Sequence, residues 1–171
     1  VYKRQIPAFT YTATAEVIAL LGAEPAFVDV DEDTYNISCE SLITKINQYP
    51  KSELSNSAII AVDLFGLPAD YNTICDIAMN SGSYLISDAA QSFGGSIGSQ
   101  KVGKLSPITT TSFYPTKPLS CYGDGGAVFT DDDEIAMKIK SIRSHGITDN
   151  PYENVRMGTN ARFDAIQAAV I

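Results

Sequence analysis

The chain has 171 residues and is 44% hydrophobic, enough for one domain with a substantial core. Its 12 Lys and Arg against 20 Asp and Glu give a net charge of −8, which argues against nucleic acid or an anionic membrane as the main partner. No apolar run approaches the roughly 20 residues needed to span a bilayer, and no signal-peptide pattern is present.

Both ends of the sequence are irregular. Residues 1–5 have no pattern of their own and are interpreted as a candidate non-native leader. Residues 163–171 stop inside an apolar helical pattern without a stop signal, so the chain is interpreted as a piece of a longer protein. The three cysteines lack metal-ligand spacing, which predicts plain buried thiols in a reducing compartment, the cytoplasm.

Strand and helix patterns alternate along the chain. Strands are predicted at residues 6–10, 26–30, 58–65, 84–86, 109–113 and 127–130. Helices are predicted to start at Thr12 or Thr14, Ser38, Asp70, Asp131 (a capping box with Glu134) and near Ala161, with residues 52–57 as a polar loop. This alternation predicts an α/β fold with a mostly parallel sheet and helices on both faces.

Polar residues follow two of the short apolar runs. Asp88 and Gln91 come after the run at 84–86. Ser112 lies near the end of the run at 109–113 and is followed by Lys117, which lies between Pro115 and Pro118. Functional groups of open α/β sheets gather at the carboxyl ends of strands. If these runs are neighbouring buried strands, an acid, an amide, a hydroxyl and a lysine meet there.

Lys117 and Asp88 each have two interpretations. Most loop lysines are solvated surface charges, but a lysine fixed by flanking prolines and partly desolvated can form a Schiff base. An Asp after a strand often caps the next helix; alternatively, Asp88 pairs with a protonated ring nitrogen that keeps a pyridine ring electron-poor. The residues alone leave both alternatives open.

Other candidates are equally ambiguous. Tyr11 is either a surface aromatic or a ring laid over a flat ligand. His145 is by default a helix C-terminal cap and alternatively a ligand contact. Asn160 and Arg162 either cap the last helix or bind an anion. The glycine turn at 123–126 matches neither the Walker pattern nor the dinucleotide fingerprint, so it is interpreted as a tight turn at a strand entry.

Seven segments in colinear order resemble the DegT/DnrJ-type nucleotide-sugar aminotransferases. They lie at residues 7–14, 27–31, 88–94, 111–119, 123–127, 145–146 and 158–169 (PAFTYTAT, FVDVD, DAAQSFG, TSFYPTKPL, GDGGA, HG and GTNARFDAIQAA). The resemblance runs from about residue 6 to residue 171. It implies the large domain of a pyridoxal-phosphate enzyme with the aspartate-aminotransferase fold (type I).

The resemblance also implies roles for individual residues. Lys117 matches the Schiff-base lysine and Asp88 its pyridinium partner. The cofactor-binding residues implied beside them are Gln91 near the ring hydroxyl, Ser112 at the phosphate, Tyr11 stacked on the ring, Ala90 between Asp88 and Gln91, and Asn160 reaching the phosphate across a homodimer interface. The presence of Lys117 favours transamination over the dehydration catalysed by relatives that lack the lysine.

The implied reaction is transfer of an amino group, with glutamate as donor, to a nucleotide-linked keto sugar. The segment 112–126 is most similar to enzymes acting on UDP-linked 3-keto or 4-keto amino sugars for surface polysaccharide. The family's first strand with its phosphate turn and its small C-terminal domain are absent from residues 6–171, so we expect this segment alone to be inactive. The alternatives are a catalytically silent relative with a binding or regulatory role, and a phosphate-binding α/β domain without this cofactor.

Overall fold

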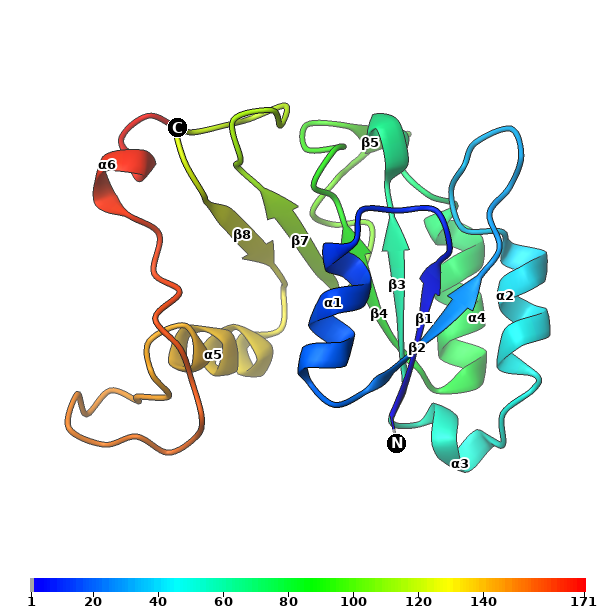
Figure 1. Ribbon diagram of the computed structural model, residues 1–171, viewed down its shortest axis with the longest axis horizontal. Coiled ribbons are helices and arrows are strands. Elements are labelled where there is room, and N and C mark those ends of the chain that lie inside the picture. Colours follow the sequence, from blue (N-terminus) through cyan, green and yellow to red (C-terminus); the bar gives the residue numbers. More distant parts are fainter. Residues whose placement is uncertain (1) are drawn as a thin grey trace.

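The computed structural model describes residues 2–171 and is built around a six-stranded sheet (Figure 1). Its strands are β1 (Lys3–Pro7), β2 (Glu24–Val28), β3 (Ala58–Val62), β4 (Tyr84–Asp88), β7 (Ile108–Ser112) and β8 (Gly126–Phe129). They lie in the order β2-β1-β3-β4-β7-β8, and only the β7–β8 pair is antiparallel. A separate antiparallel hairpin joins β5 (Ser96–Ile97) and β6 (Gln100–Lys101).

Helices lie on both faces of the sheet. They are α1 (Ala13–Leu20), α2 (Cys39–Ile46), α3 (Lys51–Leu54), α4 (Tyr71–Ser81), α5 (Asp133–Ile142) and α6 (Ala165–Ala168), with a 3₁₀ turn at Leu64–Gly66. Figure 1 shows α1 on one face, α2 and α4 on the other, and α5 and α6 beyond β8. The predicted mostly parallel sheet with two covered faces is therefore confirmed. No helix in residues 2–171 has the length and apolar character required to cross a membrane.

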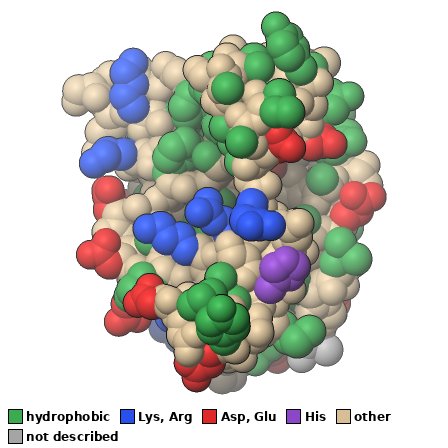
Figure 2. Space-filling view, turned by 90° about the vertical axis from the view of Figure 1, so that its left-hand side faces the viewer, with side chains coloured by type: hydrophobic (Ala, Val, Ile, Leu, Met, Phe, Trp, Pro, Cys, Tyr) green, Lys and Arg blue, Asp and Glu red, His purple; other side chains and the backbone are tan. Residues whose placement is uncertain are grey.

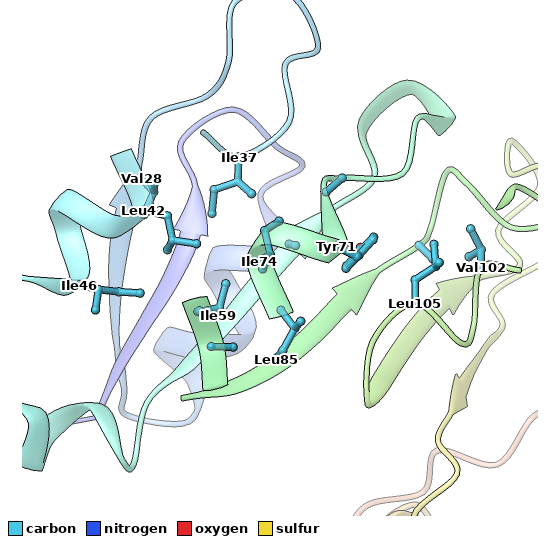
Figure 3. Close-up of a cluster of buried hydrophobic side chains, with 14 of the residues drawn as sticks. Val28, Ile37, Leu42, Ile46, Ile59, Tyr71, Ile74, Leu85, Val102 and Leu105 are labelled. Carbon is cyan, nitrogen blue, oxygen red and sulfur yellow. The ribbon is translucent and has the colours of Figure 1, made fainter. Parts of the chain in front are cut away.

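The core is divided by the sheet into a large and a small part. All five residues of β3 are buried, and they alternate between the two faces. Ile59 and Ala61 join the large cluster under α2 and α4, which includes Leu42 and Ile74 (Figure 3). Ile60 joins the small cluster, where Ile18 of α1 packs on Ile6. Fully burying one such aliphatic side chain stabilises the fold by about 1.5–3 kcal/mol.

Strand β1 begins earlier than the sequence indicates. It starts at Lys3 and pairs in parallel with β2 along its whole length, and Lys3 forms an ion pair with Glu24. Residues 3–5 of the proposed leader therefore belong to the sheet, while Val1 lies outside the described residues. That residues 1–5 are a non-native leader stays a prediction.

Several predicted boundaries differ from the structure. The strand predicted at 58–65 ends at Val62, and it could not reach Phe65, whose φ of 55° no strand accommodates. Asp132, not Asp131, caps α5, and its carboxylate accepts from the backbone N–H groups of Glu134 and Ile135. The last helix begins at Ala165 rather than near Ala161, and the predicted polar loop at 52–57 contains most of α3.

Candidate functional site

Two of the predicted site residues end neighbouring strands. Asp88 is the last residue of β4 and is paired in register with Thr110, and β7 ends two residues later at Ser112. The two strands are parallel, so both residues lie at the carboxyl edge of the sheet, near the top of Figure 1. The structure thus places the predicted acid and hydroxyl on adjacent strands.

The loop after β7 is a compact turn that carries Lys117. The Tyr114 N–H donates to Ser112 Oγ at 3.2 Å, and the Lys117 N–H donates to the Tyr114 carbonyl at 2.8 Å. The Cys121 N–H then donates to the Phe113 carbonyl at 2.9 Å, which closes the loop at its base. Lys117 is half-buried in this loop. Because Ser112 Oγ already accepts one hydrogen bond, its own O–H remains available to donate to an anion.

The Asp88 carboxylate is held by two donors. The Ala90 N–H donates to Oδ1 at 3.2 Å, and the Thr14 hydroxyl donates to Oδ2 at 3.1 Å. The sequence predicted Thr14 only as a candidate helix cap, but the cap position of α1 is Thr12, whose side chain makes no capping bond. The only sequence signal for the Thr14 contact was its place in the motif at 7–14.

Gln91 lies three residues after Asp88 and stabilises a strained turn. Its Oε1 accepts from the Phe65 N–H at 2.7 Å. Phe65 occupies the left-handed region, which is costly for a residue other than glycine. The buried Asn36 holds the same turn, accepting from the Leu64 N–H and donating to the Leu67 carbonyl, both at 3.0 Å. Gln91 and Asn36 together fix the loop after β3 next to the Asp88 edge.

Tyr11 reaches the same edge from the loop between β1 and α1. Its carbonyl accepts from the Thr14 N–H at 3.2 Å, and the residue is 75% exposed. Because Thr14 contacts Asp88, the first turn of α1 carries Tyr11 close to the end of β4. Asp88, Ala90, Gln91, Ser112, Lys117 and Tyr11 therefore gather at one edge of the sheet.

Asn160 and Arg162 lie elsewhere. Both are exposed in the segment that follows α5, where Arg162 Nε donates to Asn160 Oδ1 at 3.2 Å and Asn160 forms a bridge with Ser144. His145 belongs to the same segment, and its N–H donates to the Thr159 carbonyl at 3.0 Å. The structure does not bring these three residues to the Asp88 edge within this chain.

Sequence reasoning missed a buried carboxyl group under the site. Asp63 follows β3 and is fully buried, and its Oδ1 accepts from Tyr71 O–H at 2.6 Å and from the Ala69 N–H at 3.1 Å. Its Oδ2 accepts from the hydroxyl of Ser92, in the loop that carries Ala90 and Gln91. Burial raises the pKa of Asp63, and these hydrogen bonds oppose the shift.

A cavity of about 1240 Å³ lies away from these residues, between β7 and β8, the β5–β6 hairpin and α5. Phe113, Phe129 and Phe163 line it together with four basic side chains, and none of the predicted site residues does. Figure 2 shows this side of the molecule, where Lys and Arg side chains lie between two groups of hydrophobic ones. The arrangement of functional groups, not the size of the hollow, therefore locates the candidate site at the Asp88 edge.

The family relationship follows from comparison with known proteins. A model of the DegT/DnrJ/EryC1/StrS aminotransferase family matches residues 6–171. The chain belongs to this family. Among curated relatives, UDP-2-acetamido-2-deoxy-3-oxo-D-glucuronate aminotransferase of Pseudomonas aeruginosa is 48% identical over 165 residues, covering 96% of this chain and 44% of the relative. The chain therefore spans less than half the length of that protein.

Solved structures share the fold of this chain. A DegT/DnrJ/EryC1/StrS aminotransferase from Brucella abortus is 50% identical, with a TM-score of 0.91 over 99% of this chain and 46% of its own. The Bacillus subtilis protein NtdA, solved with bound cofactor PMP, is 30% identical, with a TM-score of 0.88 over 99% of this chain and 37% of its own. The predicted family and fold type are both confirmed.

Proposed function

We propose that this chain is the cofactor-binding part of a longer aminotransferase that uses pyridoxal 5'-phosphate and acts on a nucleotide-linked keto sugar. The observation that carries the proposal is the meeting of Asp88, Ser112 and the Lys117 loop at the carboxyl edge of β4 and β7. Membership of an aminotransferase family over residues 6–171 supports it.

The side chains at this edge fit the cofactor. Lys117 offers a primary amine for a covalent bond with an aldehyde, and Ser112 offers a hydroxyl donor for a phosphate. Each Asp88 oxygen accepts one hydrogen bond from the protein, which leaves acceptor capacity for a ring N–H. The exposed ring of Tyr11 is suited to cover a flat aromatic ligand.

The residues then have distinct tasks. When bound, pyridoxal phosphate would supply an electron sink for the negative charge at the amino-acid Cα. Asp88 would hold a proton on the ring nitrogen through a charge-assisted hydrogen bond. Lys117 would hold the cofactor through its amine and, as a general base and acid, would carry the proton from the amino-acid Cα to C4′ of the cofactor. Gln91 keeps the neighbouring loop in place.

The substrate and assembly belong to the same proposal. The acceptor is a UDP-linked 3-keto or 4-keto amino sugar and the donor is glutamate, in the cytoplasmic synthesis of precursors for surface polysaccharide. The name of the Pseudomonas aeruginosa relative, a UDP-linked 3-oxo sugar aminotransferase, supports the sugar class. Asn160 lies away from the Asp88 edge of its own chain. This position supports the proposal that Asn160 binds the cofactor phosphate in the site of the second subunit of a homodimer.

Two substitutions in the full-length protein test this function. Lys117→Ala should abolish the visible absorption band of lysine-bound cofactor, which borohydride reduction also removes, and should abolish transamination. Asp88→Asn should keep the band and slow single-turnover amino transfer by roughly 10²–10³-fold, as the loss of one electrostatic stabiliser typically does. Lys51→Ala, at an exposed position of helix α3 at the opposite end of the sheet, is the matched control and should change nothing. Transamination by Lys117→Ala at a near-normal rate would refute the proposal.

A further inference from the structure

We infer that Thr14 is a positioning residue that orients the Asp88 carboxylate toward the ring nitrogen of the bound cofactor; this inference rests on the proposed function. Thr14 Oγ1 lies 3.1 Å from Asp88 Oδ2, although the two residues are 74 positions apart in the sequence. Thr14 is 6% exposed, so water competes little for this hydrogen bond.

The direction of the hydrogen bond follows from the chemistry of the two groups. An ionised carboxylate only accepts, so the single hydroxyl hydrogen of Thr14 points to Asp88. Thr10 Oγ1 lies 3.5 Å from Thr14 Oγ1 and is placed to donate to it in turn. The three residues form a polar chain that ends at Asp88.

Two donors that lie on different segments fix the rotation of the carboxylate. Ala90 N–H holds Oδ1 from the loop after β4, and Thr14 holds Oδ2 from α1. If the Thr14 hydroxyl is removed, Oδ2 loses its partner and the carboxylate can turn about its terminal bond, which has a broad torsional preference. The alignment with a ring N–H then weakens.

Packing keeps α1 in the position that this contact needs. Ile18 lies one helical turn after Thr14, on the same side of the helix, and is almost completely buried against Ile6 and Ile60. Side chains one turn apart share a face, so the helix face that is anchored in the core also presents the hydroxyl to Asp88. Thr12, at the start of the same helix, is exposed and makes no side-chain capping bond.

The test uses three variants of the full-length protein loaded with pyridoxal phosphate labelled with ¹⁵N in its ring. Thr14→Val removes the hydroxyl and keeps the shape, Thr14→Ser keeps the hydroxyl, and Thr12→Val makes the same change at a position without the contact. Thr14→Ala replaces the valine variant if that variant does not fold. Circular dichroism and thermal melting verify that each variant is folded.

For Thr14→Val we expect the ring ¹⁵N signal to move in the same direction as in Asp88→Asn. We also expect kcat to fall about tenfold, with the KM for the amino donor unchanged, as for loss of one hydrogen bond to a charged group. Thr14→Ser and Thr12→Val should resemble the unaltered protein. A ¹⁵N signal and kcat in Thr14→Val equal to those of Thr12→Val would overturn the role of Thr14. If the unaltered protein itself bound no cofactor, the proposed function would fail instead.

Discussion

Replacement of Asp63 separates the role of its charge from the role of its hydrogen bonds. In Asp63→Asn, Oδ1 can still accept from Tyr71 O–H and the Ala69 N–H, which it contacts at 2.6 and 3.1 Å. The new amide NH₂ takes the place of Oδ2 and can donate to the Ser92 hydroxyl, which now acts as acceptor. Every buried polar group keeps a partner, so the free energy of unfolding should change by less than about 1 kcal/mol at low pH.

Asp63→Leu leaves the same surroundings without an acceptor. Tyr71 keeps one partner, because its hydroxyl also lies 2.6 Å from Ser87 Oγ. The Ala69 N–H and the Ser92 hydroxyl lose theirs, and both residues are buried. Each buried unsatisfied group costs about 1–3 kcal/mol, so the leucine variant should be destabilised by roughly 2–6 kcal/mol.

The pH dependence of stability distinguishes the protonated from the ionised form of the Asp63 carboxyl group. Because burial raises the pKa of Asp63, the folded protein keeps this proton to a higher pH than the unfolded chain does. Between the pKa of Asp63 in the unfolded chain, about 3.9, and its raised pKa in the folded protein, the unfolded state binds fewer protons than the folded state. The stability that Asp63 contributes therefore falls as pH rises through this range. Asp63→Asn has no such ionisation, so it should gain stability relative to the unaltered protein as pH rises through this window.

Urea unfolding of the three proteins, followed by circular dichroism at several pH values, measures these differences. The order expected at neutral pH is Asp63→Asn at or above the unaltered protein, with Asp63→Leu far below both. Equal destabilisation by the asparagine and leucine substitutions would refute the hydrogen-bond account. A difference between Asp63→Asn and the unaltered protein that is constant from pH 4 to pH 8 would refute the account of the charge.

Two further predictions concern the sheet. Gln5 is fully buried in β1, and neither polar atom of its side chain has a hydrogen-bond partner among residues 2–171. Gln5→Leu should therefore raise the free energy of unfolding by about 1–3 kcal/mol. A lower urea midpoint for this variant would contradict the prediction. The 171-residue chain by itself should self-associate through β8, which pairs only with β7 among the described strands, and should bind pyridoxal phosphate poorly. Val128→Lys should then reduce light scattering, and a monodisperse unaltered chain with micromolar cofactor binding would contradict the prediction.

The regular part of the fold was predictable from local patterns. Asp70, where the sequence predicts the start of a helix, caps α4 by accepting from the Thr73 N–H, and Gly82, with a φ of 72°, ends the helix. The short apolar runs correctly located β4 and β7, and therefore the edge that carries Asp88 and Ser112. Those signals depend on residues a few positions apart, which is why one sequence reveals them.

The departures come from tertiary contacts that override local preference. Phenylalanine favours strands, so nothing in the segment 58–65 signals that Phe65 adopts a left-handed φ. The structure stabilises that conformation through the buried amide of Asn36 and the side chain of Gln91, which come from two other loops. Thr14 was likewise predicted only as an alternative to Thr12 for the helix cap, because a threonine at a helix start is far more often a cap than a partner of a distant acid.

The contacts that support the candidate site share one topological origin. Thr14–Asp88, Gln91–Phe65 and Asn36–Leu64 join residues 74, 26 and 28 positions apart. They become possible because β2, β1, β3 and β4 are successive neighbours in the sheet, which places the loops that follow these strands side by side. Motif spacing can therefore indicate which residues meet the cofactor. The residues that hold them in place emerge only when the strand order is known.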